Sequence, residues 1–533
     1  MRVIVLLLLH IEEVVYDCII QKISSQHEIS SNQSKRTAEN DLWKSVVGLE
    51  VHAQINSKSK LFSSSQSVFG SATNTEVSYF DAALPGTLPV LNKYCIEAAI
   101  KTALALDCKI NTLSSFDRKH YFYPDLPAGY QITQQFNPIA SNGKISFIVY
   151  DKELGDPHEK ISCLKQLQLE QDSGRTFHVK GEKSFVDLNR AGIGLMELVF
   201  QPDLSNGKEA AALVKELILI LKRIDTCSCE MEEGTLRVDA NISVHRPGEP
   251  LGVRTEVKNL NSLRYVARAI DFEIDRQIKL LKKGDLVVNE TRAYDTQNKV
   301  TVFMRDKEVL QDYRFMPEPN LPPICLEATQ SDKTAMSIND FKDQMPVLPH
   351  EERITLMSVY KLSLKHADKL VNHEGAKDKF EAIASFLSEP DAICEFLFDI
   401  LYALLNVRQL SFKSCPLTAK QLVEIVNLLK TRTITEATAV DVLEMLFEGD
   451  QRTASDIVRD FNWYQINDEK QLEAYCHRVM AARPKMVKKY KNSGKQRYMT
   501  SLLTLLYEIT NNRAPYKESE KMFKQLIMKN EQK

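Results

Sequence analysis

Cysteine pairs of the CxxC type and glycine-rich phosphate loops are both missing from this chain of 533 residues. Of its ten cysteines, only Cys227 and Cys229 lie close together, and no CxxC pair indicates a zinc knuckle or a disulfide framework. Neither GxxxxGK[ST] nor GxGxxG occurs, so any bound nucleotide is not held by a P-loop or a Rossmann turn. Reduced, mostly structural thiols fit a cytosolic or organelle-matrix protein.

A charge imbalance and long apolar runs are lacking too. The chain has 69 Lys and Arg against 71 Asp and Glu, and this net charge of −2 excludes wholesale coating of nucleic acid while permitting a local basic patch. No run reaches the roughly 20 apolar residues that a membrane-spanning helix needs, so we expect no membrane insertion. The length predicts several domains.

The chain is predicted to change character three times. Residues 1–41 are predicted to be a targeting or disordered segment, since their early apolar run is followed by acids and then by a polar stretch without apolar periodicity. Residues 42–327 mix short strands, turns and a few helices. Helical spacing then predicts a helical domain over 328–387 and a helical tail over 388–533, with a final helix around Leu502–Ile509. The predicted class is α+β followed by all-α.

The stretch Val46–Ile55, VVGLEVHAQI, alternates apolar and polar residues and predicts a half-buried strand. Its polar face carries Glu50, His52 and Gln54, with neighbours about 6.5–7 Å apart. A carboxylate and an imidazole on one strand face resemble half of a divalent-metal site. A solvated strand face explains the same pattern and, for this stretch alone, is the more frequent case.

Two further segments carry carboxylates on predicted strands, and the second of these carboxylates needs a partner. In QLQLEQ, Leu167 and Leu169 face one way and Glu170 faces the other. In LMELVF, Glu197 lies in the middle of a strand among apolar residues. A carboxylate on a buried strand needs a partner because an unpaired buried charge is costly. That partner is either an arginine or a metal ion.

The strongest strand pattern is the pair Thr235–Val244 and Gly252–Leu260, with HRPGEP as the turn between them. Val253 is predicted to face inward with the other apolar residues. Such a hairpin can hold a nucleotide polyphosphate and its magnesium, and a ladder of cross-strand salt bridges would look the same. The predicted polar face comprises Arg237, Asp239, Asn241, Ser243, Arg254, Glu256 and Lys258.

Helix signals flank these strands. Asn92 can cap a helix that runs through Ala105, and a longer helix with an apolar stripe starts at Asn261 or Ser262 and ends at Gly284. Near the end of the chain, residues 483–497 hold Lys and Arg without any acid, with tyrosines interleaved. This local basic patch suits phosphate backbones, and a solvated helix face is the alternative.

Together the motifs resemble one family, the B subunits of the aspartyl/glutamyl-tRNA amidotransferases, in a mitochondrial version. Chance agreement in so many ordered blocks is negligible, and the helical remainder resembles the family's C-terminal part less closely. The matching blocks are GLEVHAQ at Gly48, LPGTLPVLN at Leu84, FDRKHYFYPDLPAGYQI at Phe116, VDLNRAGIGLMEL at Val186, RVDANISV at Arg237, RTEVKNLNS at Arg254, ETRAYD at Glu290 and DYRFMPEP at Asp312.

The resemblance implies a ligase of the mitochondrial matrix that works on misacylated tRNA. In this family tRNA(Gln) is first charged with glutamate, and the B subunit uses ATP to phosphorylate the glutamate side chain. Ammonia that the amidase, or A, subunit releases from glutamine then displaces the phosphate, and a small C subunit clamps the pair together. The implied fold is a glutamine-synthetase-like α+β cradle followed by a helical domain and a helical tail that grips tRNA.

The resemblance also implies which residues act. Glu50, His52, Glu170 and Glu197 correspond to a catalytic magnesium cluster. The adjoining cradle for ATP and its phosphates corresponds to Arg237, Asp239, Arg254, Glu256 and Lys258. The contacts to tRNA correspond to Lys488, Lys489, Lys491 and Lys495.

The chain departs from the family pattern at several places, including Gly194 where the family usually has a proline and His120 where it has an asparagine. Bacterial relatives carry four zinc-binding cysteines where this chain has residues such as Ser63 and Ser65, so no zinc site is expected. Gln171 replaces a second adjacent glutamate, which leaves the expected cluster one charge short. This departure keeps a non-catalytic tRNA-binding scaffold open as the alternative function. A free-standing glutamine-synthetase-like ligase is a third reading, and the lack of a recognisable amidase nucleophile motif weighs against such self-sufficiency.

Overall fold

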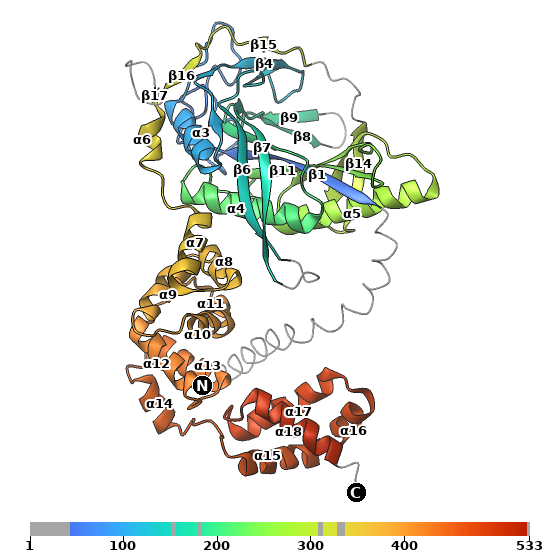
Figure 1. Ribbon diagram of the computed structural model, residues 1–533. Helices are drawn as coiled ribbons and strands as arrows, with labels where there is room; N and C mark the ends of the chain where they lie inside the picture. The colour runs from blue at the N-terminus through green and yellow to red at the C-terminus, as the bar shows by residue number, and fades with distance from the viewer. Residues whose placement is uncertain (1–42, 151–155, 180–182, 307–312, 328–335, 530–533) are drawn as a thin grey trace. The chain divides into compact units, whose positions relative to one another are not determined.

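The computed structural model describes residues 43–529, apart from 151–155, 180–182, 307–312 and 328–335 (Figure 1). The predicted targeting or disordered segment 1–41 lies outside the described residues. The described chain forms two compact units, one ending at Glu352 and one beginning at Arg353. The first is rich in strands and the second is helical, which confirms the predicted α+β class followed by helices.

The first unit is built on a nine-stranded sheet with the order β14-β13-β12-β11-β1-β10-β7-β6-β2. Its neighbouring strands are antiparallel except for the parallel pair β12–β13. The first strand of the sequence therefore lies in the middle of the sheet. The strands are β1 (Lys44–Gln54), β2 (Lys109–Ile110), β6 (Ala140–Val149), β7 (His158–Gln171), β10 (Gly194–Phe200), β11 (Leu236–His245), β12 (Thr255–Leu260), β13 (Glu290–Asp295) and β14 (Val300–Asp306).

Three small sheets accompany the large one. One has the order β15-β4-β5, and β5 contacts the end of β7 in the large sheet. The others have the orders β17-β16-β3 and β8-β9. Their strands are β3 (Leu113–Ser114), β4 (Asp117–His120), β5 (Tyr130–Thr133), β8 (Arg175–Val179), β9 (Lys183–Asp187), β15 (Met316–Pro317), β16 (Ile324–Glu327) and β17 (Met336–Ser337).

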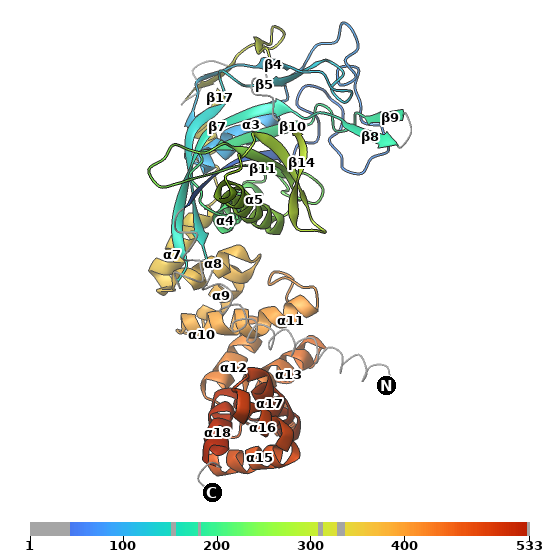
Figure 2. The ribbon, with the colours of Figure 1, turned by 90° about the vertical axis from the view of Figure 1, so that its right-hand side faces the viewer.

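Helices cover the apolar side of the large sheet. They are α3 (Lys93–Ala105), α4 (Gly207–Arg223) and α5 (Leu263–Lys283), with the short α6 (Ile338–Lys342). The helices α4 and α5 lie side by side beneath the strands (Figure 2). Their buried residues share one core with the apolar residues Val47, Leu49, Val51 and Ala53 of β1. Because side chains alternate along a strand, the polar face of β1 points away from this core.

Local signals explain where these helices begin and end. The Asn92 side chain accepts a hydrogen bond from the Tyr94 amide and caps α3, as predicted. Ser262 is the N-cap of α5, and Gly284 ends it with φ of 84°, a left-handed conformation that glycine adopts without strain. Gly207 lets α4 approach α5 closely, since a Cβ there would lie 2.1 Å from the carbonyl oxygen of Ala267.

The second unit continues from α7 as a series of helices with two apolar cores. One core lies between Leu356 and Val458, and the other between Ile466 and Ile527. The predicted boundaries at 327/328 and 387/388 stay predictions. The helices are α7 (Pro349–Tyr360), α8 (Leu364–Asn372), α9 (Ala376–Ala384), α10 (Pro390–Glu395), the π-helical η1 (Phe396–Leu401), α11 (Tyr402–Val407), α12 (Ala419–Lys430), α13 (Glu436–Phe447), α14 (Ala454–Asp460), α15 (Glu469–Ala482), α16 (Pro484–Ser493), α17 (Gln496–Thr510) and α18 (Tyr516–Lys529).

The prediction that the chain's final helix lies around Leu502–Ile509 is wrong. That stretch belongs to α17, which ends where Asn511 and Asn512 adopt positive φ, and α18 follows it. Buried Phe523 and Leu526 of α18 complete the second helical core. Among the described residues, no helix is long and apolar enough to cross a lipid bilayer.

Candidate metal and phosphate site

The strand order lines up polar residues from four strands on one face of the large sheet. Residues directly opposite one another in an antiparallel pair point to the same face, and β1 lies between β10 and β11. The predicted polar face of a single strand thereby becomes a continuous polar surface. The register pairs Gln168 with Glu197, Glu197 with His52, His52 with Arg237, and Glu50 with Asp239.

Glu50, His52 and Glu197 lie close enough together to hold one metal ion. One ligand atom from each can be chosen so that all three lie within 4.8 Å of one another. Nε2 of His52 lies 3.7 Å from Oε1 of Glu50 and 3.5 Å from Oε1 of Glu170. The structure therefore brings together the four residues predicted as a metal cluster.

The neighbours of Glu197 bear on whether its partner is an arginine or a metal ion. Its carboxylate accepts a hydrogen bond from the side-chain amide of Gln168 and interacts with the carboxyl group of Glu170. Within the described chain, no arginine pairs with it. Between the two alternatives, an arginine or a metal ion, the geometry favours the ion.

Burial and mutual repulsion make these carboxyl groups hold protons strongly. Burial, and after it the charge of Glu197, raises the pKa of Glu50 to about 7. Burial and the charge of Glu170 likewise raise the pKa of Glu197 to about 7, and burial raises the pKa of Glu170. A divalent cation among them would compensate these charges. Carboxylate oxygens with one imidazole nitrogen are a donor set that magnesium and similar divalent ions accept.

Lys258 and Asp239 form an ion pair beside the cluster. The Lys258 ammonium lies 3.0 Å from Oδ2 of Asp239 and 3.6 Å from Oε1 of Glu256. Burial raises the pKa of Asp239, but Lys258 and His52 outweigh this effect and lower it below its ordinary value. One cross-strand ion pair is thus present here, next to the candidate metal cluster, and it is compatible with both a salt-bridge ladder and a phosphate cradle.

A β-bulge fixes the position of Lys258. Between the pairs Val238–Leu260 and Ala240–Val257, β12 has one residue more than β11, and Asn259 adopts a φ of 60°. Oδ1 of Asp239 accepts a hydrogen bond of 3.0 Å from the Asn259 amide. Asp239 therefore holds both the bulge and the lysine that the bulge presents.

Arg237 offers an unused donor next to His52. Its terminal nitrogen donates a hydrogen bond of 2.8 Å to Oδ2 of Asp172, which also lies 3.4 Å from Nε of Arg190. Nε of Arg237 is buried without a hydrogen-bond partner. A buried N–H without an acceptor is costly, and a phosphate oxygen would satisfy it. This orphaned atom supports the fit of a phosphate group.

Arg254 lies outside the paired strand, and its predicted contact with phosphate stays a prediction. β12 begins at Thr255, so Arg254 precedes the strand and is exposed. The prediction that Val253 faces inward is wrong, because its side chain is 47% exposed. The register ends at the pair Ile242–Thr255, and the chain between His245 and Thr255 has left the sheet. Alternation of residue types continued past the point where backbone pairing stops.

Glu256 lies within the strand but has its own partner. Its side chain is buried and accepts a hydrogen bond of 3.1 Å from the Thr291 hydroxyl of β13. The register pairs Glu256 with Asn241, one row farther from His52 than Asp239. Lys258, whose ammonium lies 3.6 Å from Oε1 of Glu256, connects it with the other residues of the predicted phosphate cradle.

The sequence interpretation missed residues of β4 and β5 that border the cluster. The Thr133 hydroxyl donates a hydrogen bond of 3.3 Å to Oε2 of Glu170. After burial, which raises the pKa of Glu170, the charge of Lys119 has the next largest effect and lowers it. The Lys119 ammonium also lies 4.8 Å from the centre of the Tyr313 ring. In the sequence, the position of Lys119 beside the aromatic residues of the block FDRKHYFYP was the feature that could have indicated its role.

The structure gives a setting for two of the departures from the family pattern. Gln171 follows Glu170 in β7, and successive side chains of a strand point to opposite faces, so Gln171 does not share the face of the cluster. Ser63 donates a hydrogen bond of 3.1 Å to Asp81, which also pairs with the fully buried Lys60 at 3.1 Å. Where the resemblance places zinc-binding cysteines, the Lys60–Asp81 ion pair and the Ser63 hydroxyl therefore connect the segment around residue 60 with Asp81.

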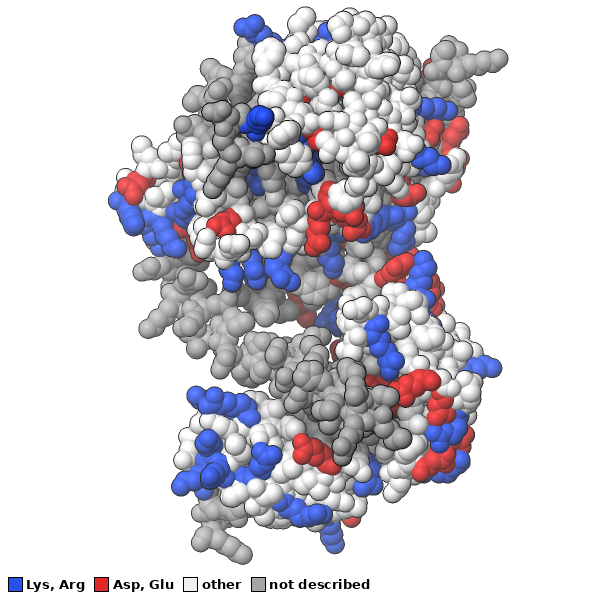
Figure 3. Space-filling view, turned by 180° about the vertical axis from the view of Figure 1, so that it is seen from behind, with Lys and Arg blue, Asp and Glu red and all other residues white. Residues whose placement is uncertain are grey.

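A second candidate surface lies on the helical tail. Lys488, Lys489 and Lys491 belong to α16, and Lys495 is the N-cap residue of α17. All four side chains are exposed, and Figure 3 shows Lys and Arg gathered on the tail helices. The basic patch of the sequence is therefore exposed to solvent. Exposure is required both for contact with a phosphate backbone and for a merely solvated helix face.

Comparison with known proteins agrees with these features. Residues 45–332 match a family described as GatB/GatE catalytic domain, and residues 378–527 match one described as GatB domain. The mitochondrial B subunit of the glutamyl-tRNA(Gln) amidotransferase of Aedes aegypti is 46% identical over 494 residues, which cover 91% of this chain and 93% of the relative. The protein of the same name from Homo sapiens is 46% identical over 499 residues, 92% of this chain and 89% of the relative. The B subunit of the aspartyl/glutamyl-tRNA(Asn/Gln) amidotransferase of Rickettsia bellii is 41% identical over 464 residues, 87% of this chain and 92% of the relative.

Proposed function

The chain belongs to the GatB family, the B subunits of tRNA-dependent amidotransferases, and from this premise we propose that it activates the glutamate of misacylated Glu-tRNA(Gln). ATP phosphorylates the glutamate side chain, and ammonia from a partner amidase, the A subunit, then replaces the phosphate to give Gln-tRNA(Gln). A small C subunit joins the two. The gathering of Glu50, His52, Glu170 and Glu197 on one sheet face carries this proposal.

The mitochondrial location agrees with the relationship. The animal relatives that match most of the chain are named mitochondrial. The product of the proposed reaction then serves mitochondrial translation.

The residues of the cluster fit a magnesium ion. Glu50, Glu170 and Glu197 would supply oxygen ligands, and His52 would supply one nitrogen. When bound, magnesium screens the negative charges that ATP and the substrate carboxylate bring together. Glu170 is buried and Glu50 and His52 are only partly exposed, so their charges are screened less than charges on an open surface.

Cations beside the cluster would position the transferred phosphate. Arg237 lies directly opposite His52 in the sheet, and its Nε–H has no hydrogen-bond partner. Lys258 is held by Asp239, which lies opposite Glu50. Lys119 approaches the same carboxylates from β4. Phosphoryl transfer depends on such positioning and on charge stabilisation, with little covalent work for the protein.

Reconstitution with both partner subunits, Glu-tRNA(Gln), ATP and glutamine tests the proposal. Glu50→Ala and His52→Ala should abolish formation of Gln-tRNA(Gln) while tRNA binding persists. Gln54→Ala is the matched control, since Gln54 lies on the same face of β1 and contacts Ser67 instead of the cluster. Unchanged amidation by Glu50→Ala and His52→Ala would contradict the metal assignment.

The alternative function is a non-catalytic tRNA-binding scaffold, which the sequence raised because of Gln171. A scaffold binds tRNA in a salt-sensitive way but shows no tRNA-dependent hydrolysis of ATP. A free-standing ligase would act without tRNA and without partner subunits. Measuring ATP hydrolysis with and without Glu-tRNA(Gln), and with and without the partners, separates the three.

We also propose that Lys488, Lys489, Lys491 and Lys495 contact tRNA phosphates. Their exposure on α16 and at the start of α17 supports this role. Removal of each phosphate-binding lysine should make binding less dependent on salt. Measurement of tRNA affinity at several salt concentrations tests each lysine.

A further inference from the structure

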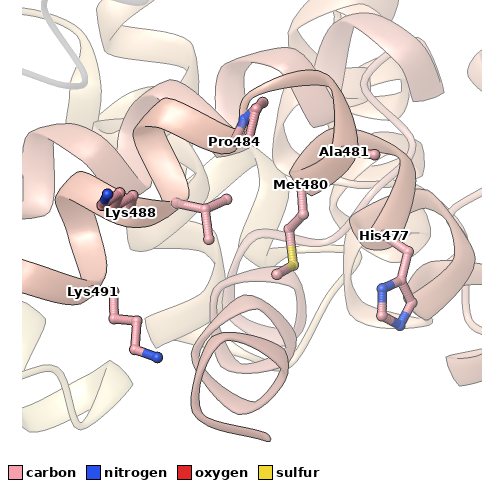
Figure 4. Close-up of a pocket in the computed structure, with 7 residues that line it drawn as sticks. His477, Met480, Ala481, Pro484, Lys488 and Lys491 are labelled. Atoms are coloured by element: carbon pink, nitrogen blue, oxygen red, sulfur yellow. The ribbon is translucent and has the colours of Figure 1, made fainter. Parts of the chain in front are cut away.

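A hollow of about 440 Å³ lies on the helical tail, where α15 gives way to α16 (Figure 4). Its volume falls within the roughly 300–1,000 Å³ that small-molecule sites occupy. Arg483 ends α15 with non-helical backbone angles, and Pro484 starts α16. The lining residues are His477, Met480 and Ala481 from α15 and Pro484, Val487, Lys488 and Lys491 from α16.

The spacing of the lining residues shows that two helix faces form the hollow. On α15 they lie three and four residues after His477, and on α16 they lie three, four and seven residues after Pro484. Met480 is 8% exposed and lies at the base, whereas Lys488 and Lys491 are exposed. No acidic residue lines the hollow.

An apolar base with a cationic rim fits a ligand that is apolar on one side and anionic on the other. A nucleotide within an RNA strand has this character, because its base is a flat ring and its phosphates are charged. The polarisable thioether of methionine packs well against such rings. The lysine rim complements the phosphates on either side.

We propose that this hollow takes one unstacked nucleobase of the tRNA, while Lys488 and Lys491 hold the phosphates that flank it. The inference rests on the proposed binding of tRNA by the tail and adds a site for one base to it. The lysines alone attract any phosphate backbone. A base site selects an RNA that presents an unpaired nucleotide.

The two helices supply matched controls. Ala482 is exposed on α15 like Ala481 but does not line the hollow, and Lys485 is exposed on α16 like Lys488 but lies outside it. Ala481→Phe should fill the hollow, and Ala482→Phe adds the same bulk elsewhere. Lys488→Ala and Lys485→Ala remove the same charge from two places.

The test uses the full-length chain, a tRNA(Gln) transcript and a fully paired RNA duplex, with affinities measured at several salt concentrations. Ala481→Phe should weaken tRNA binding about tenfold, the effect of removing one base from its site. It should leave the salt dependence unchanged, because no cation is removed, and it should leave duplex binding unchanged. Lys488→Ala should lower the salt slope by about 1 and weaken tRNA binding, whereas Lys485→Ala should change both quantities less.

Two results overturn the base site alone: Ala481→Phe binding tRNA as tightly as Ala482→Phe, or Ala481→Phe weakening duplex and tRNA equally. Failure of the unaltered chain to bind tRNA contradicts the proposed role of the tail, and the base site with it. Thermal melting verifies that Ala481→Phe folds. If its melting temperature falls, the smaller Ala481→Leu replaces it under the same criteria.

Discussion

The two candidate surfaces of this chain are built in opposite ways. The sheet site collects buried charges from β1, β7, β10 and β11, strands that are far apart in the sequence. The tail surface uses exposed lysines from one short stretch of chain. Buried charges interact strongly and need compensation, while exposed charges are screened by salt. The first kind of surface suits chemistry at one point, and the second suits attraction of a long anion.

The sharpest contrast should appear in catalysis. Glu197→Gln keeps the shape of the side chain but removes a charge from the cluster, and it should lower the rate of amidation by about 1,000-fold, or about 4 kcal/mol. Replacement of any single tail lysine should change the rate at saturating tRNA by less than about threefold, since these lysines contact only the bound substrate. Single-turnover formation of Gln-tRNA(Gln) measures both. Similar decreases in the rate of amidation for Glu197→Gln and for a tail-lysine variant would contradict the difference between the two surfaces.

The buried ion pair of the sheet offers a test of stability. Lys258→Met leaves Asp239 without its cation, and we expect the free energy of unfolding to fall by about 2 kcal/mol. Part of the ionic interaction is screened, because 28% of the Lys258 side chain is exposed. Denaturant unfolding gives the value. The double variant Lys258→Met with Asp239→Asn should recover part of the loss, and no recovery would show that packing, not charge, is responsible.

The response of stability to pH should also be confined to the sheet unit. The pKa of Glu50 and of Glu197 is raised to about 7 in the folded chain. A raised carboxyl pKa stabilises the folded state fully below the unfolded value of about 4.5 and loses that effect as pH rises through about 7. Chelator-treated protein should therefore lose about 3 kcal/mol per carboxyl group between pH 4.5 and pH 8.

Divalent cations and a charge-neutral variant serve as controls for this pH effect. Magnesium should restore thermal stability at pH 8, and Glu197→Gln should flatten the pH dependence of the melting temperature. The same variant is the one expected to lose activity, as is common where a functional site stores unfavourable charge. If the melting temperature of Glu197→Gln changed with pH in the same way as that of the unaltered chain, the raised pKa values of Glu50 and Glu197 would be contradicted.

The smallest effects are expected on the tail. Lys489→Ala should leave the free energy of unfolding within about 0.5 kcal/mol of its original value, because the side chain is exposed. Its effect should appear in tRNA affinity at low salt and fade at high salt. Thermal melting and a salt titration of binding measure the two quantities. A large loss of stability would mean that this lysine belongs to the fold.

How much the sequence could predict differs between the two surfaces for a physical reason. The tail lysines are neighbours in sequence, so composition alone located them. The face of β1 followed from its period of two, which depends only on strand geometry. The arrangement of β1 between β10 and β11 depends on long-range pairing, and it was the family resemblance, not periodicity, that joined Glu50 to Glu170 and Glu197.

The misses have physical causes as well. Val253 continued an alternation of residue types beyond the last backbone pair, and no side-chain pattern marks where a ladder of hydrogen bonds ends. Lys119 reaches the carboxylates from a separate small sheet, so no periodicity connects it with them. The helix α18 follows a break at Asn511 and Asn512, where both residues adopt positive φ. The sequence pattern of the preceding apolar stretch does not predict a further helix after this break.

The central place of β1 has a consequence for how the chain reaches its fold. Both neighbours of β1 lie far downstream, β10 ending at Phe200 and β11 at His245. During synthesis both edges of this apolar strand stay open until those segments have left the ribosome, and open edges invite pairing with other chains. Nascent chains that stop before His245 should therefore be the ones that aggregate or occupy chaperones, and folding of the sheet should be slow in proportion to these long closures.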